Sequence, residues 1–540
     1  MKKIYSFFII LLFVSVQIQA QVTTVPTVPE ANGAVTINFN KSGTPLSTYT
    51  GTIYAHIGVT VNGQQWQNVI GSWGNNTTQP ALTFVSGTTY SLSLTPDLFT
   101  KFGVPTTSSI TQICVVFRAA SGSPQSIDYF LNVGAFQASL VTPATNSTTI
   151  LNSGSNLPIS ANNTNGNANY NLLANGLSIH TFTGSNYAYT DTNITENKNY
   201  ELQITQGTTT LIRRFSVIVN PGTVSQAIPA GLQDGINYNS SDPTKATLVL
   251  DAFNKDFIYV AGSFNNWQPN TSYVMKKDPS STKFWLELSG LTPGQIYTYQ
   301  YWVVKQTPIA NSPALVKVAD PYSTLVLSPF DDPWIPASSY PNLPTYPQGQ
   351  EREVTVLQTG QTPYVWSAAT TNFVKPKKED LVVYEVLVRD FDANRNYQDL
   401  INKIDYFKNL KVNAIQLMPV MEFEGNESWG YNTAFHLALD KFYGTPAKFK
   451  EFVDLCHQNG IAVILDVALN HAFGRNPMVR MWMSDPDGDG WGDPSSENPY
   501  FNQSAMHSYN VGSDFNHQQA RTKYYTKRVI DHWINEYKID

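Results

Sequence analysis

The stretch Gly-Ile-Ala-Val-Ile-Leu-Asp-Val-Ala-Leu-Asn-His, residues 460–471, decides the fold of the C-terminal third of this chain. Residues 461–467 are an almost continuous apolar run, which is typical of a strand buried on both faces. The run ends on the polar pair Asn470 and His471. Gly460 just before it is a favoured residue past a helix end, so residues 446–459 are predicted to be a helix.

Two further apolar runs lie upstream, and they predict more elements of the same kind. Strands are expected over residues 381–388 and 413–420. Residues 397–410 between them have apolar positions at helical spacing. Alternating strands and helices are typical of parallel β/α units. A long insertion is expected over residues 472–518, and the next helix over 519–537.

The first 345 residues have a different pattern, with short alternating runs broken by Gly, Asn, Ser and Thr. This pattern predicts all-β domains. We expect a β-sandwich over 22–135, an immunoglobulin-like sandwich over 136–222, a third β unit over 223–345 and a linker over 346–380. Trp66 and Trp73 are expected on loops of the first sandwich. Exposed tryptophans there would suit glycan stacking, and a place in the core is the alternative.

Composition limits the classes of function. Hydrophobic residues are 41% of the chain and charged residues 14%, which is enough apolar material for several cores. The formal net charge of −6 argues against a nucleic-acid partner, which would select a basic surface. Aromatic residues are 13%, an excess that suits sugar stacking and also suits β-rich proteins in general.

The N-terminus is typical of a secretory signal peptide over residues 1–20. Lys2 and Lys3 precede an apolar run over 4–16, and Ala20 offers a small residue at a cleavage point. An uncleaved anchor is the alternative, but the run is short for a membrane span. We therefore expect a secreted or periplasmic protein without a stable membrane anchor. Cys114 and Cys456 lie in different predicted domains, so two buried free thiols are expected.

Four motifs in the last 160 residues resemble, in order, the first part of glycoside hydrolase family 13, the α-amylase superfamily. They are Tyr384-Glu385-Val386, Ser428-Trp429-Gly430-Tyr431-Asn432, Tyr443-Gly444-Thr445-Pro446 and the 460–471 stretch. The resemblance implies an eight-stranded (β/α)8 TIM barrel with its site at the C-terminal ends of the strands. About three of the eight strands lie within residues 381–540. The expected fold is therefore multidomain, with N-terminal β-sandwiches followed by a truncated barrel.

The same resemblance implies roles for individual residues. Tyr431 would stack under the sugar at the cleavage point, and His471 would donate to hydroxyls of that sugar. Asp466 and Trp429 would support the site. Asn470 would be a calcium ligand, although branching-type members can lack the metal.

The reacting carboxylates of such an enzyme are expected beyond residue 540. Retaining cleavage needs two carboxyl groups about 5–5.5 Å apart. In the family they follow strands four and five, and a third acid follows strand seven. Asp540 would precede strand four, and Glu385 and Glu422 belong to the first two strand regions. We therefore expect this chain to be catalytically inactive, and its C-terminal third to be poorly packed.

The third β unit resembles carbohydrate-binding module family 48 through the run Gly262-Ser263-Phe264-Asn265-Asn266-Trp267. The resemblance implies that Trp267 stacks on glucan. A core or rim position for Trp267 is the alternative, since Gln300 stands where the related module has a lysine. In that case the unit would be a spacer.

One acidic loop is a candidate calcium site. Asp485, Asp487 and Asp489 alternate with other residues, and Gly490 follows at the sixth position, as in the front of a calcium-binding loop. The twelfth position is Ser496, where a glutamate is required, so a solvated turn is the alternative.

Together these patterns predict a secreted enzyme that acts on starch, glycogen or related α-glucans with retention, truncated before its catalytic carboxylates. Calcium is the only cofactor considered, and no organic cofactor is expected. The alternatives are a non-catalytic α-glucan-binding protein, or a branching or debranching enzyme rather than an amylase.

Overall fold

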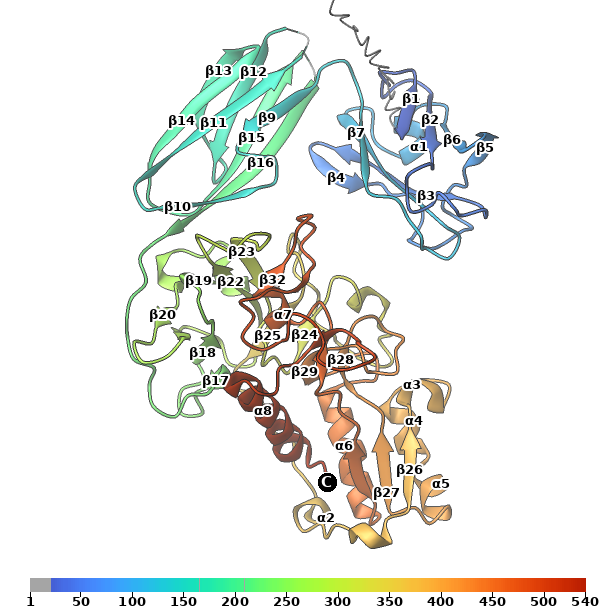
Figure 1. Ribbon diagram of the computed structural model, residues 1–540, viewed down its shortest axis with the longest axis vertical. Helices are drawn as coiled ribbons and strands as arrows, with labels where there is room; N and C mark the ends of the chain where they lie inside the picture. Colours follow the sequence, from blue (N-terminus) through green and yellow to red (C-terminus); the bar gives the residue numbers. More distant parts are fainter. Residues whose placement is uncertain (1–20, 165, 208) are drawn as a thin grey trace, which may run out of the picture. The chain divides into compact units, whose positions relative to one another are not determined.

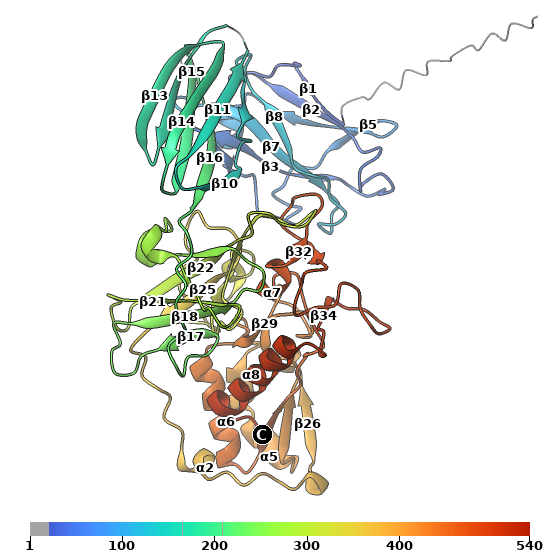
Figure 2. The same cartoon turned by 60° about the vertical axis from the view of Figure 1, so that its left-hand side comes forward.

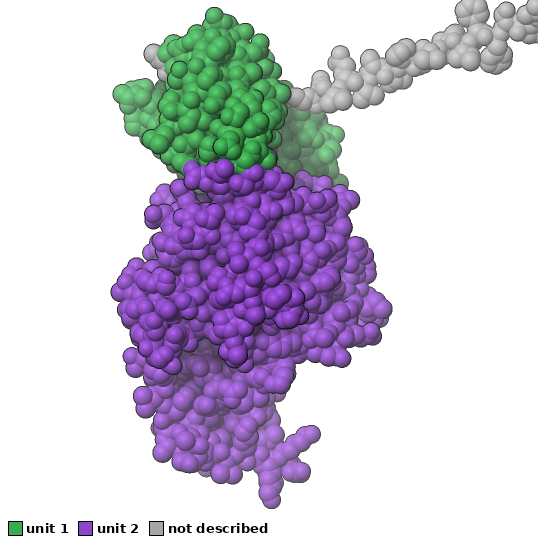
Figure 3. Space-filling model, turned by 90° about the vertical axis from the view of Figure 1, so that its left-hand side faces the viewer, with its two compact units in different colours: residues 1–149, 154–194, 198–217 green, residues 150–153, 195–197, 218–540 purple. Residues whose placement is uncertain are grey.

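The computed structural model describes residues 21–164, 166–207 and 209–540. The predicted signal peptide, residues 1–20, lies outside the described residues. Among the described helices, none has the length and apolar character needed to cross a bilayer. The chain divides into two compact units, coloured separately in Figure 3: residues 1–149, 154–194 and 198–217, and residues 150–153, 195–197 and 218–540.

The first unit begins with a two-sheet sandwich (Figure 1). One sheet has the order β1-β2-β6-β5, the other β4-β3-β7-β8. Alternate residues of each sheet point into one shared core, which is why the alternating pattern predicts it. The strands are β1 (Val22–Val25), β2 (Val35–Asn40), β3 (Tyr54–Val61), β4 (Gln64–Gln67), β5 (Thr83–Ser86), β6 (Thr89–Leu94), β7 (Ile110–Arg118) and β8 (Tyr129–Asn132), with helix α1 (Leu98–Phe102) before β7.

A second group of antiparallel strands follows. Its sheets have the orders β10-β16-β15-β12-β13 and β14-β11-β9. The strands are β9 (Ala138–Thr142), β10 (Thr148–Asn152), β11 (Ser155–Asn163), β12 (Ala168–Ala174), β13 (Leu177–Gly184), β14 (Asn186–Ile194), β15 (Lys198–Gln206) and β16 (Thr209–Asn220).

The second unit starts with two more antiparallel sheets, ordered β17-β18-β21-β20 and β19-β22-β25-β24, with β23 also paired to β22. The strands are β17 (Gly235–Tyr238), β18 (Ala246–Asp251), β19 (Phe257–Gly262), β20 (Lys276–Lys277), β21 (Lys283–Leu288), β22 (Ile296–Val304), β23 (Leu315–Val318), β24 (Val326–Leu327) and β25 (Val354–Gln358). Short 3-10 helices lie at Ser263–Asn265, Thr271–Tyr273, Asp332–Trp334 and Lys378–Asp380.

The 460–471 stretch lies in a parallel sheet of order β26-β27-β30 (Figure 2). Its strands are β26 (Val383–Val386), β27 (Ala414–Leu417) and β30 (Ala462–Leu465), all parallel. The predicted buried strand over 381–388 is shorter and lies at the sheet edge, which leaves Val382 and Val383 about half exposed. The helices are α2 (Ala368–Thr371), α3 (Val388–Phe391), α4 (Tyr397–Asn402), α5 (Ile404–Asn409), α6 (Pro446–Gln458) and α8 (Ala520–Tyr537).

The helix predicted over 397–410 is two short helices, α4 and α5. They meet at Lys403, whose φ of −104° and ψ of 14° leave the helical region. Long loops follow β27 and β30. They contain β28 (Met421–Phe423), β29 (Thr433–Leu439), β31 (His471–Ala472), α7 (Pro477–Arg480), β32 (Met483–Ser484), β33 (Asp493–Pro494) and β34 (Ser513–Asp514).

The expectation of a poorly packed C-terminal third is wrong. Helix α8 buries Tyr525, Val529, Trp533 and Tyr537, one residue per turn, and Phe449 of α6 packs against the last two. These side chains belong to one hydrophobic core that also includes Leu248 and other residues of the third β unit. The parallel sheet is therefore buried against helices and β-sheets within its own unit. Cys114 and Cys456 are buried free thiols, as predicted.

Candidate functional site

The candidate site lies where the loops leave β27 and β30. Parallel strands bring their carboxyl ends to one edge of a sheet, and loops at that edge can converge. Asp466 directly follows β30, and its N–H donates to the Leu417 carbonyl at the end of β27 at 2.8 Å. Tyr431 lies in the loop between β28 and β29. Sequence positions 35 apart therefore meet at one edge.

Tyr431, Asp466 and His471 form one hydrogen-bonded group. The Tyr431 hydroxyl donates to Asp466 Oδ2 at 2.5 Å, and His471 Nε2 lies 2.5 Å from the Tyr431 carbonyl oxygen. The hydrogen bond to Asp466, together with burial, raises the pKa of Tyr431 to about 12. Tyr431 is therefore a neutral donor at all physiological pH values, and Asp466 is half-buried with a partner for its carboxylate.

The tautomer of His471 follows from its contact. A carbonyl oxygen only accepts, so Nε2 carries the proton and Nδ1 is the acceptor in the neutral ring. His471 Nδ1 is buried and has no hydrogen-bond partner among the described residues. The resemblance implied a donor at this position. The geometry instead leaves a free acceptor nitrogen, which a sugar hydroxyl would satisfy.

The loop that carries Tyr431 is held by its own side chains. Gly430 N donates to Ser428 Oγ at 2.9 Å, and Asn432 Nδ2 donates to the Glu424 carbonyl at 2.6 Å. Gly430 has a φ of 92°, in the left-handed region. Trp429 projects outward with 62% of its side chain exposed, so its expected support role has no packing partner comparable to that of Tyr431.

A buried ionic cluster lies in the same loop system, and sequence reasoning did not find it. Lys441 is 1% exposed, contacts Glu422, and lies 3.4 Å from Asp332. Burial raises the pKa of Glu422 to about 7 although Lys441 opposes the shift. Burial, then the charge of Glu422, raises the pKa of Asp440 well above its usual value. The signal in the sequence was an Asp-Lys pair after an otherwise apolar strand, β29.

A second missed residue is His436 of β29. It is 1% exposed, its Nε2 lies 3.1 Å from the Ala468 carbonyl, and the Tyr525 hydroxyl lies 3.3 Å from its Nδ1. Burial lowers the pKa of His436 to about 4, so the ring is neutral. It ties β29 to the loop after β30 and to α8. An alternating polar residue in a buried strand was its only signal in the sequence.

The other predicted residues lie apart from this group. Trp267 is half-buried with a φ of 59° and packs against Leu327, Val354 and Val356. Gln300 is fully buried and donates to the Glu351 and Glu353 carbonyls. This placement resembles the rim position that the sequence left as an alternative.

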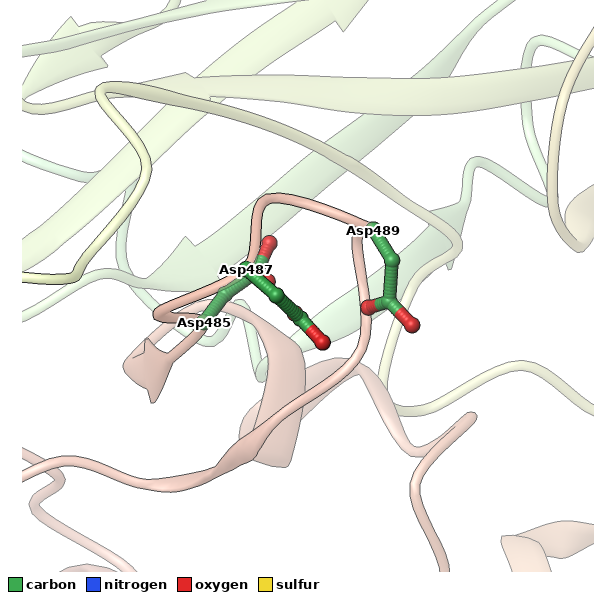
Figure 4. Close-up of side chains that lie close together, drawn as sticks. All are labelled: Asp485, Asp487 and Asp489. Atoms are coloured by element: carbon green, nitrogen blue, oxygen red, sulfur yellow. The ribbon is translucent and has the colours of Figure 1, made fainter. Parts of the chain in front are cut away.

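The three aspartates of the acidic loop do come together (Figure 4). One carboxylate oxygen of each of Asp485, Asp487 and Asp489 lies within 4.8 Å of the others. The Asp485 carboxylate accepts from Gly488 N at 2.9 Å and Gly490 N at 3.0 Å, which orders the turn. Asn470 belongs to a different place, after β30, where its carbonyl accepts from Phe515 N at 2.9 Å.

Comparison with known proteins supports the resemblance in the C-terminal segment. Residues 389–540 match the family model described as alpha amylase, catalytic domain. The malto-oligosyltrehalose trehalohydrolase of Saccharolobus solfataricus is 34% identical over 173 residues, which cover 31% of this chain and 28% of that protein. The 1,4-alpha-glucan branching enzyme GlgB of Halothermothrix orenii is 26% identical over 226 residues, covering 40% of this chain and 31% of that protein.

Among solved structures, the pullulanase of Paenibacillus barengoltzii in complex with maltohexaose and alpha-cyclodextrin aligns with a TM-score of 0.41. The alignment is 18% identical and covers 58% of this chain and 48% of that one. The chain spans less than a third of the length of the two curated relatives above.

Proposed function

Because residues 389–540 are an α-amylase-type segment of glycoside hydrolase family 13, we propose that this protein acts on α-glucans such as starch or glycogen. The observation that carries the proposal is the group of Tyr431, Asp466 and His471 at the carboxyl edge of β27 and β30. It offers an aromatic ring, a carboxylate and a free ring nitrogen at the edge where barrel enzymes bind substrate. Curated relatives with branching and trehalohydrolase names support a glucan substrate.

The chemistry proposed for the family is retaining, through one carboxylate that attacks the sugar and another that protonates the leaving oxygen. The two steps serve hydrolysis and glucan transfer alike, so the proposal covers amylase, branching and debranching activities. We place β26, β27 and β30 as the first three strands of a TIM barrel. The carboxylates implied by the resemblance follow later strands, so the 540-residue chain is proposed to hold glucan without cleaving it. A secreted or periplasmic location is proposed from the signal-like residues 1–20.

Loss of the Tyr431 ring tests the proposal. In isothermal titration calorimetry, Tyr431→Ala should bind maltoheptaose at its barrel site at least tenfold more weakly, about 1.4 kcal/mol, because ring stacking and the ordered Asp466 carboxylate are lost. Tyr406→Ala, a matched change of a tyrosine on α5 that is 43% exposed, should bind like the parent chain. Neither chain should release reducing sugar from starch. Unchanged binding by Tyr431→Ala contradicts the site, and reducing-sugar release contradicts the non-cleaving role.

We also propose that the acidic loop binds calcium. Calcium–oxygen distances of about 2.3–2.6 Å allow ligands of one ion to be at most about 5 Å apart. The three aspartate oxygens satisfy this limit. The cation would screen three carboxylates from one another and fix the loop between β32 and β33.

Calorimetry with calcium chloride tests this site. The parent chain should give a binding heat, and Asp487→Asn should abolish it, because the variant removes one charged ligand from the group. Asp493→Asn is the control, since this exposed aspartate of the same segment lies outside the group. A parent chain that gives no heat, or an Asp487→Asn variant that keeps it, contradicts the proposal.

A further inference from the structure

The outward face of the sheet β4-β3-β7-β8 in the first unit carries aromatic side chains where solvent-facing polar residues are expected. The inward face contributes Ile57, Val115 and Phe117 to the core. The outward face carries four rings, which we call the aromatic cradle: His56, Trp66, Trp73 and Phe130. Trp73 is 43% exposed and Phe130 39%. A contiguous set of exposed rings on a sheet face marks a binding surface rather than a core.

The rings of the cradle contact one another but do not share a plane. His56 lies 5.4 Å from Trp66 at 31° and 5.0 Å from Trp73 at 68°, centroid to centroid. Trp66 lies 6.1 Å from Phe130 at 73°. Flat ribbons such as β-1,4-glucans need coplanar rings to stack along their length. Rings tilted in this way suit a chain that curves, as α-1,4-linked glucose does.

A buried polar relay supports the cradle from below. Arg118 is fully buried, and its Nε donates to Gln79 Oε1 at 2.6 Å. Guanidinium groups only donate, so the Gln79 oxygen faces Arg118 and its Nε2 faces His56 Nδ1, also at 2.6 Å. The His56 proton is therefore on Nε2. No described residue accepts from His56 Nε2, so this N–H is available to a ligand hydroxyl.

Two costly features coincide at this face. Trp66 has a φ of 54°, which is an outlier for a bulky side chain, and it lies where the β3–β4 pairing has a register shift. Arg118 Nη2 is buried without a hydrogen-bond partner, and the guanidinium lies 5.9 Å from the Trp73 ring centre. Backbone strain and unsatisfied buried donors concentrate at functional sites. Their coincidence here indicates a face shaped for a ligand rather than for stability.

We propose that the aromatic cradle is a second, non-catalytic glucan-binding site, which takes a curved, uncharged α-glucan chain across Trp66 and Trp73 with a hydroxyl accepting from His56 Nε2. The choice of α-glucan as the ligand rests on the proposed function of the C-terminal segment, whereas the existence of the site rests on the cradle alone. Such a site would hold the polymer while another part of the chain engages it.

Affinity electrophoresis of the full chain tests the site. Native gels would contain glycogen, hydroxyethylcellulose or no polysaccharide. Trp66→Ala/Trp73→Ala should lose most of the retardation by glycogen, with the dissociation constant raised at least tenfold. Phe84→Ala is the matched control, because this 59% exposed ring lies on β5 of the other sheet. It should be retarded like the parent chain, and hydroxyethylcellulose should retard neither.

Comparison with Tyr431→Ala separates the two sites. Glycogen retardation that survives in Trp66→Ala/Trp73→Ala and is lost in Tyr431→Ala overturns the cradle and leaves the proposed function intact. The reverse result supports the cradle and counts against the C-terminal site. Equal retardation by hydroxyethylcellulose overturns the assignment to α-glucan. If the double variant melts at a lower temperature, Trp73→Ala alone, with a readout of maltoheptaose-induced tryptophan fluorescence change, decides the question, and an unaltered change overturns the proposal.

Discussion

Replacing Gly430 by alanine should lower the free energy of unfolding of the second unit by about 2–4 kcal/mol. Gly430 has a φ of 92°, and an added Cβ would lie 2.3 Å from the Pro419 carbonyl oxygen and 2.8 Å from Pro419 Cβ. Both neighbours are held by the chain that follows β27, so the loop itself must move. Because Tyr431 is the next residue, the same change should also displace its hydroxyl from Asp466 and abolish maltoheptaose binding at that site.

Gly425→Ala is the matched control for this prediction. Gly425 has a similar φ of 81° in the same loop system, but nothing lies within 4 Å of an added Cβ. The control should therefore cost only the backbone strain, about 1 kcal/mol. Urea unfolding, with hydrogen exchange of residues 421–445 to locate the effect, measures both. Equal losses in the two variants would contradict the steric argument.

Replacing Lys441 by methionine should be the most destabilising change in the ionic cluster, by about 3–5 kcal/mol near neutral pH. The side chain is 1% exposed and is the cation that faces Glu422 and Asp332. Its removal leaves buried carboxylates without a counter-charge. Lys448→Met is the matched control, because Lys448 forms an exposed pair with Glu451 on α6 and should cost less than about 1 kcal/mol.

The cluster also predicts a pH dependence of definite sign. Burial raises the pKa of Glu422 from 4.5 to about 7 and raises that of Asp440 well above its usual value. A carboxyl group whose pKa is raised on folding stabilises the fold below its unfolded pKa and loses that contribution as pH rises through the folded pKa. Stability from these groups should therefore fall between about pH 5 and pH 8.

In Lys441→Met this fall should be steeper, because the charge that opposes ionisation-linked unfolding is gone. The difference in unfolding free energy between the variant and the parent chain should be smallest near pH 5 and largest near pH 8. Melting curves of both chains across this range measure it. A variant whose deficit is independent of pH would show that Lys441 contributes by packing alone.

Much of the C-terminal segment could be predicted from local patterns. The runs around Ile415 and Val463 are strands, and the helices before Gly460 and before Lys538 are present within one or two residues of their predicted bounds. The break at Lys403 could not be read, because the apolar spacing continues through it. The exposed edge of β26 could not be read either, since an apolar run does not indicate which of its sides has a neighbour.

The candidate site was predicted in its members but not in its bonding. The motif order placed Tyr431 and His471 after successive strands, and parallel strands end at one edge, so their proximity follows from topology. Only the folded chain decides that His471 donates to the Tyr431 carbonyl and keeps Nδ1 free. The choice depends on the path of a loop 40 residues away.

The sequence by itself determined the sugar-handling chemistry of the last third and the strand and helix content of most of the chain, because apolar periodicity and short motifs act over a few residues. The tertiary structure alone decided the Lys441 cluster, the shared core of the third β unit with the parallel sheet, and the aromatic cradle on the first sandwich. These features depend on which distant side chains lose water together, and burial of a charge or a ring is a property of the packed neighbours rather than of the local sequence.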